Sequence, residues 1–259
     1  MSIFKGDKIM EWGVWSDHTN VMPVPERVSL QVKERYELRP DRTQVSSNTA
    51  HKSLQENKKN TSYQTGVKKM EFKGSRTEQN VLAAFAGESQ ARTRYSFFAS
   101  AARKEGFEQV GAVFQQTSDE EKEHAKLFFK QLKGGDAEIT ASYPAGVIGT
   151  TRDNLMAAAK GEKMEWGTLY PAFAKMAEDE GFKDIANLFR QVGRVEVYHE
   201  RRYTKLLTNL EKDGVFKKEA PAQWYCRNCG YVHDGKAAPV KCPVCDHPQS
   251  YFELWVENY

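Results

Sequence analysis

The chain has 259 residues, a formal net charge of +3 and 39% hydrophobic residues, which fits one large domain with a smaller attachment, or two domains. The small net charge is not the signature of a nucleic-acid-binding protein. No apolar run approaches the length of a membrane span, and residues 1–20 lack the continuous apolar stretch of a signal peptide. We therefore expect neither a nucleic-acid partner nor a membrane partner.

Residues 1–70 are polar and have no hydrophobic period, so we expect an N-terminal extension that is disordered or weakly ordered. In residues 71–213, by contrast, apolar residues recur at helical spacing, which predicts an all-α domain. Ser75 and Glu78 can form a capping box at its start. Gly106 and Gly181 each follow a pair of charged residues and are expected to end helices.

The middle of the helical region is interrupted. Gly134-Gly135 is expected to close the second helix, and residues 136–150 have no helical period. This stretch is long for a bundle turn, so we interpret it as a crossover between two helical hairpins, as in a ferritin-like four-helix bundle. Beyond the helices we expect a linker at residues 214–223 and a small cysteine-containing module at residues 224–259.

A Glu-x-x-His pattern occurs twice in the helical region, and the two copies lie 75 residues apart. Each copy is preceded, 33 or 34 residues upstream, by a glutamate in a Gly-Glu pair. Residues at i and i+3 share a helix face, so each pattern offers an oxygen and a nitrogen to one point, and the combined set is typical of a di-iron site. The candidate ligands are Glu88, Glu121, His124, Glu162, Glu196 and His199. One copy alone would indicate only a surface charged pair, whereas the matched duplicate favours a dinuclear metal site.

The duplication is imperfect at one place. Most matched positions are offset by 75 residues but the Gly-Glu pairs by 74, so one residue was gained within the third helix. Glu165 lies three residues after Glu162 on the same helix face and is a seventh candidate ligand. Its repeat equivalent is Gln90 or Ala91, so Glu165 breaks the internal symmetry.

Tyr95 and Tyr170 also occupy equivalent positions in the repeat, about two helical turns after Glu88 and Glu162. They can donate hydrogen bonds to ligand carboxylates, or they can be ordinary core aromatics. The sequence favours neither interpretation over the other.

The four cysteines form two C-x-x-C pairs, Cys226 with Cys229 and Cys242 with Cys245, separated by 12 residues. This layout predicts a closed tetrahedral metal site rather than disulfides, and fits a reducing cytoplasm. The spacing does not choose between iron and zinc, although the residues around both pairs resemble the metal-binding knuckles of rubredoxin.

From about Met70 to Tyr259 the sequence resembles the rubrerythrin family. The resemblance is carried by KGSRTEQN (73–80), AFAGESQAR (84–92), DEEKEHAK (119–126), YPAGVI (143–148), GEKMEW (161–166), YPAFA (170–174), EVYHE (196–200) and WYCRNCGYVHDG (224–235). It implies a ferritin-like bundle with a rubredoxin-like module, all seven carboxylate and histidine ligands above, and one iron held by the four cysteines. No ligand position departs from the family pattern.

The resemblance also implies a function, namely a non-haem di-iron peroxidase that reduces hydrogen peroxide to water and protects against oxidative stress. Glu165, Tyr95 and Tyr170 are the expected catalytic residues, with Glu165 exchanging with His124 at one iron as the metal charge changes. Electrons would come from NAD(P)H through a separate reductase or a rubredoxin, because the chain has no Gly-x-Gly-x-x-Gly fingerprint. A homodimer or higher homo-oligomer in the cytoplasm is expected.

Two alternatives belong to other functional classes. A ferroxidase or iron-handling protein of ferritin type would use the same bundle, but it does not need an attached electron-transfer module. The other alternative is a zinc-binding scaffold or interaction protein without enzymatic activity, which metal analysis and the visible spectrum would distinguish. The extension departs from the family, whose members of this type typically begin near Met70, so we hypothesise that residues 1–69 are upstream sequence read in frame.

Overall fold

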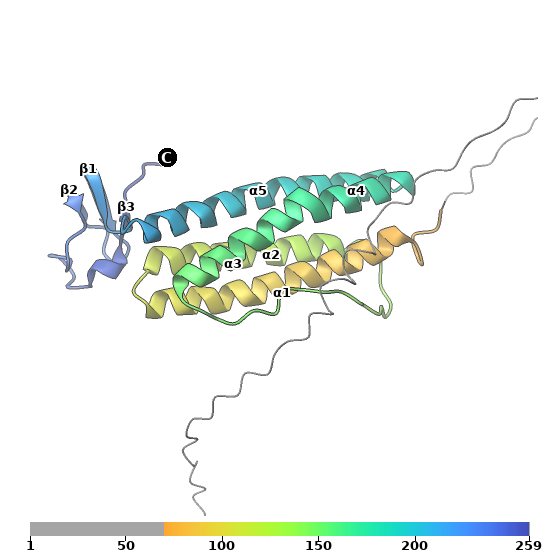
Figure 1. Cartoon of the computed structure of the whole chain (residues 1–259), viewed down its shortest axis with the longest axis horizontal. Helices are drawn as coiled ribbons and strands as arrows, with labels where there is room; N and C mark the ends of the chain where they lie inside the picture. The colour runs from red at the N-terminus through yellow and green to blue at the C-terminus, as the bar shows by residue number, and fades with distance from the viewer. Residues whose placement is uncertain (1–69, 259) are drawn as a thin grey trace, which may run out of the picture. The chain divides into compact units, whose positions relative to one another are not determined.

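The larger domain is a bundle of four helical rods, which lie side by side in Figure 1. The protein is represented by a computed structural model that describes residues 70–258, and the expectations for residues 1–69 lie outside this range. The helices are α1 (Arg76–Lys104), α2 (Glu108–Phe129), α3 (Thr151–Met164), α4 (Tyr170–Asp179) and α5 (Lys183–Glu211). A π-helical segment, η2 (Glu165–Leu169), joins α3 to α4 so that they form one rod. The predicted ferritin-like bundle is confirmed.

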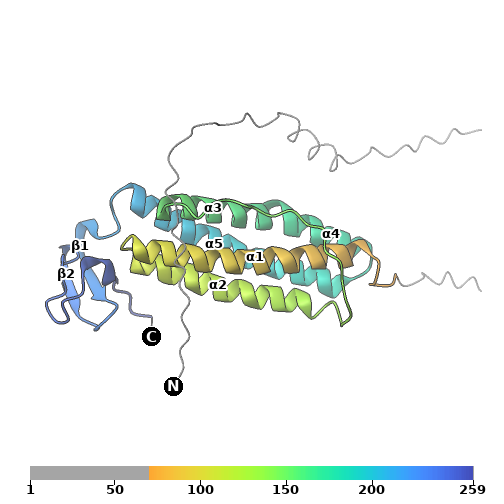
Figure 2. The same ribbon diagram turned by 90° about the horizontal axis from the view of Figure 1, so that it is seen from below.

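The chain enters the second hairpin through the long crossover that the sequence predicts. Residues 133–150 contain no helix or strand and run along the bundle from the end of α2 to the start of α3 (Figures 1 and 2). The second helix is shorter than expected, since α2 ends at Phe129 and two consecutive turns through Leu132 separate it from Gly134-Gly135.

The hairpin turns use equivalent glycines. Gly106 and Gly181 follow α1 and α4 with φ angles of +85° and +87°, a left-handed conformation that glycine adopts without steric cost. At the other end of α1, the Ser75 hydroxyl accepts a hydrogen bond from the Glu78 N–H at 3.0 Å. The Glu78 carboxylate reaches back one residue further than a capping box requires, to the N–H of Gly74 at 2.6 Å.

Two glutamates at repeat-equivalent positions tie the hairpins together. Glu180, after α4, accepts hydrogen bonds from the N–H and hydroxyl of Thr77 at 2.8 and 2.6 Å, at the first turn of α1. Glu105, after α1, accepts from the N–H of Thr151 at 3.0 Å, at the first turn of α3. Each carboxylate satisfies backbone donors that a helix start leaves free and lies at the positive end of the helix dipole. The sequence analysis did not foresee this reciprocal pair.

The residue gained in the third rod is accommodated as a π-helical turn. Segment η2 begins three residues after Glu162 and ends immediately before Tyr170, which is where the two repeat offsets disagree. A π turn holds one residue more than an α turn, and such turns occur frequently at functional sites. The prediction of an insertion within the third helix is confirmed, and Glu165 is the first residue of the π segment.

Aromatic side chains fill the bundle core in two clusters that are related by the repeat. One cluster contains Tyr95, Phe98, Phe114 and Tyr203. The other contains Phe128, Tyr170 and Phe189 in addition to small residues. Burial of these large apolar surfaces is the main stabilising contribution to such a bundle.

The C-terminal module is a three-stranded antiparallel sheet with strand order β2-β1-β3. Its strands are β1 (Lys217–Cys226), β2 (Val232–Ala237) and β3 (Phe252–Leu254). Trp224 is fully buried in the module core and donates a hydrogen bond to the carbonyl of Gly235 at 3.0 Å. The structure differs from the expected linker at residues 214–223, because residues 217–223 belong to β1, in which Lys217, Ala222 and Gln223 pair with β2 on either side of an irregularity.

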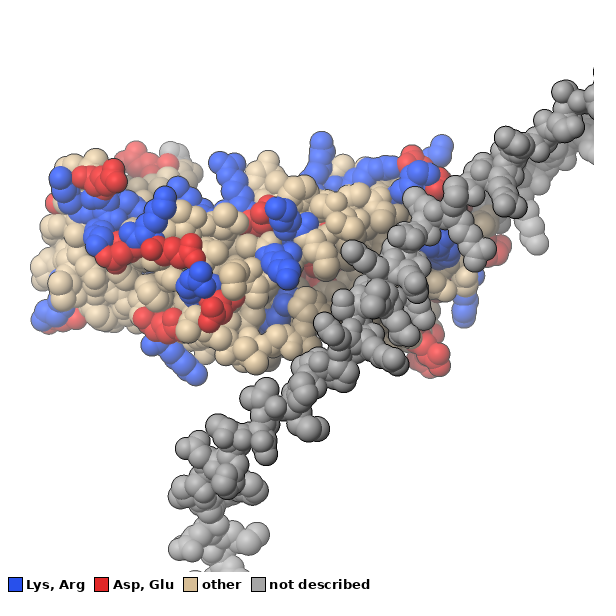
Figure 3. All heavy atoms as spheres, in the orientation of Figure 1, with Lys and Arg blue, Asp and Glu red and all other residues tan. Residues whose placement is uncertain are grey.

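The visible face of the bundle carries charged side chains of both signs among uncharged ones (Figure 3). On the face in Figure 3, lysine and arginine side chains are interspersed with aspartate and glutamate side chains, so this face does not present a field of one sign. None of the helices in residues 70–258 has the length and apolar character needed to cross a membrane.

The reciprocal carboxylates give a test of how the hairpins are held together. We expect Glu180→Ala to destabilise the fold by about 1 kcal/mol, because the donors of Thr77 lose their partner at the start of α1. Urea unfolding at equal metal content measures the change. Asp179→Ala, which removes only an exposed pair with Lys175, is the matched control. Equal stability of the two variants would contradict a capping role for Glu180.

Candidate metal centre

Seven ionisable side chains meet in the interior of the bundle. Their exposed fractions range from 0% to 8%, and they are Glu88 from α1, Glu121 and His124 from α2, Glu162 from α3, Glu165 from η2, and Glu196 and His199 from α5. Isolated buried carboxylates are costly, and this number within one core is tolerated only with cations or protons among them. The structure thus brings together all of the predicted ligands from four rods.

The side chains form two overlapping groups of potential ligands. In each group, one ligand atom from each of four residues lies within 4.8 Å of the others. The first group is Glu88, Glu121, His124 and Glu196, and the second is Glu121, Glu162, Glu196 and His199. Glu121 and Glu196 belong to both, which is the arrangement expected of carboxylates that bridge two metal ions. Each group adds one further glutamate and one histidine.

Several atoms of the cluster face each other without hydrogen-bond partners. Among the described residues, these atoms include one carboxylate oxygen each of Glu88, Glu121 and Glu162, and both oxygens of Glu196. The Nδ1 atom of His199 lies 2.6 Å from Glu196 Oε2 without hydrogen-bond geometry. Hard oxygens and imidazole nitrogens directed at shared points suit iron, so the residues present fit a di-iron centre.

The electrostatics of the cluster without metal follow from burial and mutual repulsion. Burial and the neighbouring charge of Glu121 raise the pKa of Glu162 to about 8 and raise that of Glu88 well above its usual range. Burial opposes protonation of His124, but contacts with Glu121 and Glu196 outweigh it and raise its pKa to about 10. Protons therefore occupy the cluster in place of metal, and metal binding must release them.

Glu165 lies beside the cluster but in neither group of four. It is 8% exposed, and burial together with the charges of Glu162 and Glu196 raises its pKa. Of the seven predicted ligands, six are brought into the two groups, whereas Glu165 is held nearby on the π segment.

The two repeat-equivalent tyrosines contact ligand carboxylates from opposite sides. Tyr95 donates to Glu162 Oε1 at 2.5 Å, and Tyr170 donates to Glu88 Oε1. Both rings are also packed in the aromatic clusters. Each tyrosine is thus both a core aromatic and a hydrogen-bond donor to a ligand carboxylate. Each connects an aromatic cluster to one of the two ligand groups.

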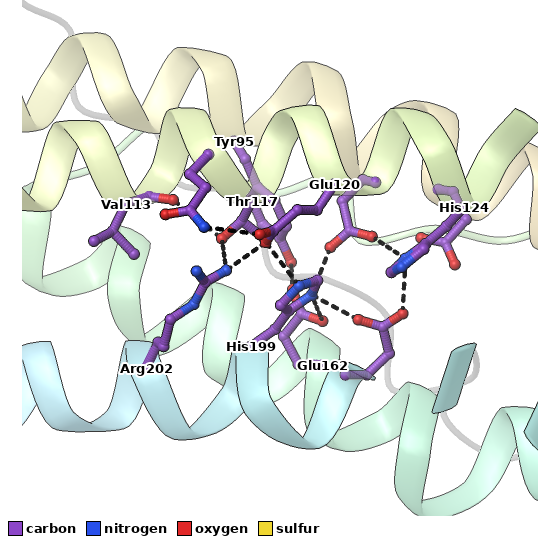
Figure 4. A network of polar contacts seen from close by, with 12 residues as sticks. Tyr95, Val113, Thr117, Glu120, His124, Glu162, His199 and Arg202 are labelled. Atoms are coloured by element: carbon purple, nitrogen blue, oxygen red, sulfur yellow. Dashed lines mark hydrogen bonds and ion pairs between the residues drawn. The ribbon is translucent and has the colours of Figure 1, made fainter. Parts of the chain in front are cut away.

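A second layer of polar side chains surrounds His199 (Figure 4). Glu120 Oε2 lies 3.0 Å from His199 Nε2 and 2.6 Å from a guanidinium nitrogen of Arg202. Arg202 also donates to the Thr117 hydroxyl at 2.7 Å. Burial would raise the pKa of Glu120, but contacts with His199 and Arg202 lower it to about 2. The sequence analysis missed these three residues, and comparison of the two repeats position by position was the signal that could have found them.

The four cysteines form the second candidate site. The Sγ atoms of Cys226 and Cys245 are 3.8 Å apart, and those of Cys229 and Cys242 are 3.6 Å apart. Four sulfurs at about 2.3 Å from a central metal ion in a tetrahedron lie roughly 3.8 Å from one another, which matches these Sγ–Sγ distances. The same distances are too long for disulfide bonds. The N–H of His247 lowers the pKa of Cys245 to about 6, which favours a thiolate ligand. The cysteines therefore fit a single iron or zinc ion.

Comparisons with known proteins agree with both sites. A family model described as Rubrerythrin matches residues 79–207, and another, described as Rubrerythrin, rubredoxin-like domain, matches residues 224–253. The chain is 60% identical to a Rubrerythrin of Porphyromonas gingivalis, over 73% of this chain and 94% of that protein. It is 50% identical to a Rubrerythrin of Nitratidesulfovibrio vulgaris, over 73% of this chain and 98% of that protein. A solved structure of nigerythrin in a mixed-valence state aligns with a TM-score of 0.48 at 30% identity, covering 70% of this chain and 87% of that one.

The overlap between the two ligand groups predicts different losses of metal from two variants. Glu121→Ala removes a ligand shared by both groups, so we expect both ions of the centre to be lost. Glu88→Ala removes a ligand of one group only, so we expect one ion to remain. Metal analysis after purification and reloading gives the stoichiometry, with the ion of the four-cysteine site as the internal control. Identical losses from the two variants would argue against a bridging role for Glu121.

Proposed function

Because this chain belongs to the rubrerythrin family, we propose that it is a peroxidase that reduces hydrogen peroxide to water at its di-iron site and thereby protects against oxidative stress. The observation that carries the proposal is the presence, in one chain, of two ligand groups with shared carboxylates and a separate four-cysteine site. The first arrangement suits two-electron chemistry and the second suits one-electron transfer.

The chemistry that iron supplies is simple to state. A di-iron centre held by the two ligand groups would supply the two electrons that are needed to cleave one O–O bond. The protein contributes negative charge from Glu121 and Glu196, which offsets the increase in positive charge on oxidation. Tyr95 and Tyr170 hold the outer carboxylates Glu162 and Glu88 in place through their hydroxyl groups.

Glu165 and His124 are proposed to respond to the charge at the centre. In the structure His124 is in a ligand group and Glu165 is outside both groups, although it is buried next to them. A carboxylate gains more than a neutral imidazole from proximity to a more positive metal. An exchange of Glu165 for His124 on oxidation would therefore keep the site close to electrically balanced.

The cysteine module is proposed to return electrons one at a time from a reductase or a rubredoxin, with NAD(P)H as the ultimate donor. It also favours a peroxidase over a ferroxidase of ferritin type, because iron storage does not require an electron inlet. We further propose that the protein acts in the cytoplasm as a homodimer or larger homo-oligomer.

The peroxidase assignment predicts which oxidant reoxidises the reduced di-iron site faster. We expect the anaerobically reduced protein to be reoxidised rapidly by hydrogen peroxide and more slowly by oxygen, because the two electrons stored in the site complete the reduction of peroxide to water, whereas oxygen needs four. Stopped-flow absorption of the ferric centre measures both rates at equal oxidant concentration. Reoxidation that is indifferent to peroxide would defeat the assignment and favour the ferroxidase alternative.

If the four-cysteine site delivers electrons to the di-iron site, one variant should separate turnover with a reductase from a single oxidation of the di-iron site. Cys226→Ser should abolish peroxide turnover with a reductase, because the four-cysteine site loses a ligand. It should spare a single round of oxidation at the chemically reduced di-iron site, which Cys226 does not contact. Both are measured on the same preparation, with helical content by circular dichroism as the check on folding. Loss of both activities would indicate a structural role for the module instead.

A further inference from the structure

The two histidines of the di-iron site are related by the repeat, but their surroundings are not. Around His199 stand Thr117, Glu120 and Arg202, whose side chains are all polar or charged. The positions offset by 75 residues, which correspond to the surroundings of His124, carry Val192, Val195 and Leu127. Every polar member of the set around His199 thus has an apolar residue at its repeat-equivalent position, and of these Val195 borders the same hollow as His124.

On the His199 side, the two ring nitrogens face different partners. Nδ1 faces the carboxylate cage, at 2.6 Å from Glu196 Oε2 and 3.1 Å from Glu121 Oε1. Nε2 faces outward and lies 3.0 Å from Glu120 Oε2 (Figure 4), although this ion-pair contact, like that of Nδ1, lacks hydrogen-bond geometry in the structure. The Glu120 carboxylate is itself fixed, because Arg202 donates to it and is braced on Thr117. A ring that binds metal through Nδ1 must carry its proton on Nε2, directly opposite this carboxylate.

On the His124 side, only the inner nitrogen has polar contacts. Nδ1 lies 2.8 Å from Glu121 Oε2 and 3.0 Å from Glu196 Oε1. Within residues 70–258, Nε2 of His124 makes neither a hydrogen bond nor an ion pair. The ring borders a surface hollow on which Val195, at the position equivalent to Glu120, offers no acceptor; the polar side chains of the same hollow, Gln115, Gln116, Asp119, Glu120 and Glu123, make no hydrogen bond to the ring. An imidazole here loses no outer contact when it rotates away from the cage.

We propose that Glu120, braced by Arg202 and Thr117, is a positioning residue that keeps His199 on its metal ion, and that the apolar counterparts leave His124 as the one histidine free to exchange. A carboxylate that accepts from the outer N–H of a ligating imidazole fixes the orientation of the ring and raises the basicity of the inner nitrogen. This inference rests on the proposed exchange of Glu165 for His124 and explains why the other histidine does not take part.

The test uses the full chain loaded with Zn²⁺, which is diamagnetic and does not react with peroxide. Proton–nitrogen NMR follows exchange of the two imidazole Nε2–H protons with water. We expect the proton of His199 to exchange slowly and that of His124 to exchange rapidly. Glu120→Ala should make the His199 proton exchange rapidly. It should also lower the affinity of the protein for one of the two Zn²⁺ ions by about 10- to 100-fold. Glu120→Gln keeps an acceptor oxygen and should restore part of both properties.

Glu123→Ala is the matched control, because Glu123 is an exposed carboxylate on the same helix that pairs only with Lys126. It should leave both protons and both affinities unchanged. Slow exchange at His199 in Glu120→Ala, with unchanged Zn²⁺ affinity, would overturn the proposal. These measurements involve neither peroxide nor iron oxidation, so their failure is distinguishable from failure of the peroxidase assignment.

A second variant tests the converse change at His124, so that the proposal does not depend only on a variant that removes a contact. Leu127 and Val195 are 38% and 37% exposed, so the double substitution L127R/V195E places charged groups where water can reach them. It gives His124 the carboxylate and guanidinium that His199 already has. We expect the Nε2–H of His124 to become slowly exchanging. A folded double variant in which that proton still exchanges rapidly would count against the proposal, since a carboxylate at this position would then not fix the ring.

Discussion

The mutual repulsion of five buried glutamates is the constraint on which the rest of the structure depends. Glu88, Glu121, Glu162, Glu165 and Glu196 lie in the interior of one bundle, with only two histidines among them. Like charges in a medium of low polarity repel strongly, and each carboxylate also loses its hydration. Without metal the cluster must take up protons, as the raised pKa of Glu162 and His124 indicates. The repulsion among these carboxylates destabilises the folded bundle until cations bind. The aromatic clusters and the caps that join the hairpins offset this destabilisation.

The duplicated hairpin supplies six of the ligands as two repeat-related sets of three. One extra residue in the second hairpin adds Glu165, which has no equivalent in the first. An additional residue in an α-helix would rotate everything after it by about 100°. The π turn at Glu165–Leu169 absorbs that residue, so Tyr170 still reaches Glu88 as Tyr95 reaches Glu162. Glu165 occupies the first position of this turn, beside the ligands but not among them. The insertion thus adds a carboxylate to one half of the site without disturbing the other contacts.

The sequence predicted the features that depend on local spacing. The i, i+3 pairs predicted the ligands on α2 and α5, and the unequal repeat offsets predicted the insertion that the structure contains as η2. Contacts between distant segments were not predicted, because a carboxylate such as Glu180 gives no local sign that it will cap the helix beginning at Arg76. Glu120 was missed for a related reason, since adjacent charged residues on a helix usually face water. Residues 217–223 looked like a linker because their apolar residues are few, and only pairing with β2 defines them as a strand.

The asymmetry around the two histidines and the position of Glu165 are the two places where the site departs from the repeat. An exchange of ligands needs one group that can leave and another that can enter, and a symmetric site would offer two equivalent groups to leave. Here Glu120 lies 3.0 Å from the outer nitrogen of His199, whereas Val195 stands at the equivalent position beside His124 and offers no acceptor. The added carboxylate at Glu165 has no equivalent in the first hairpin, where Gln90 or Ala91 stands. Under the proposed exchange, these two departures from the repeat, the polar network around His199 and the inserted residue at η2, would give a nearly symmetric scaffold a single direction of ligand exchange.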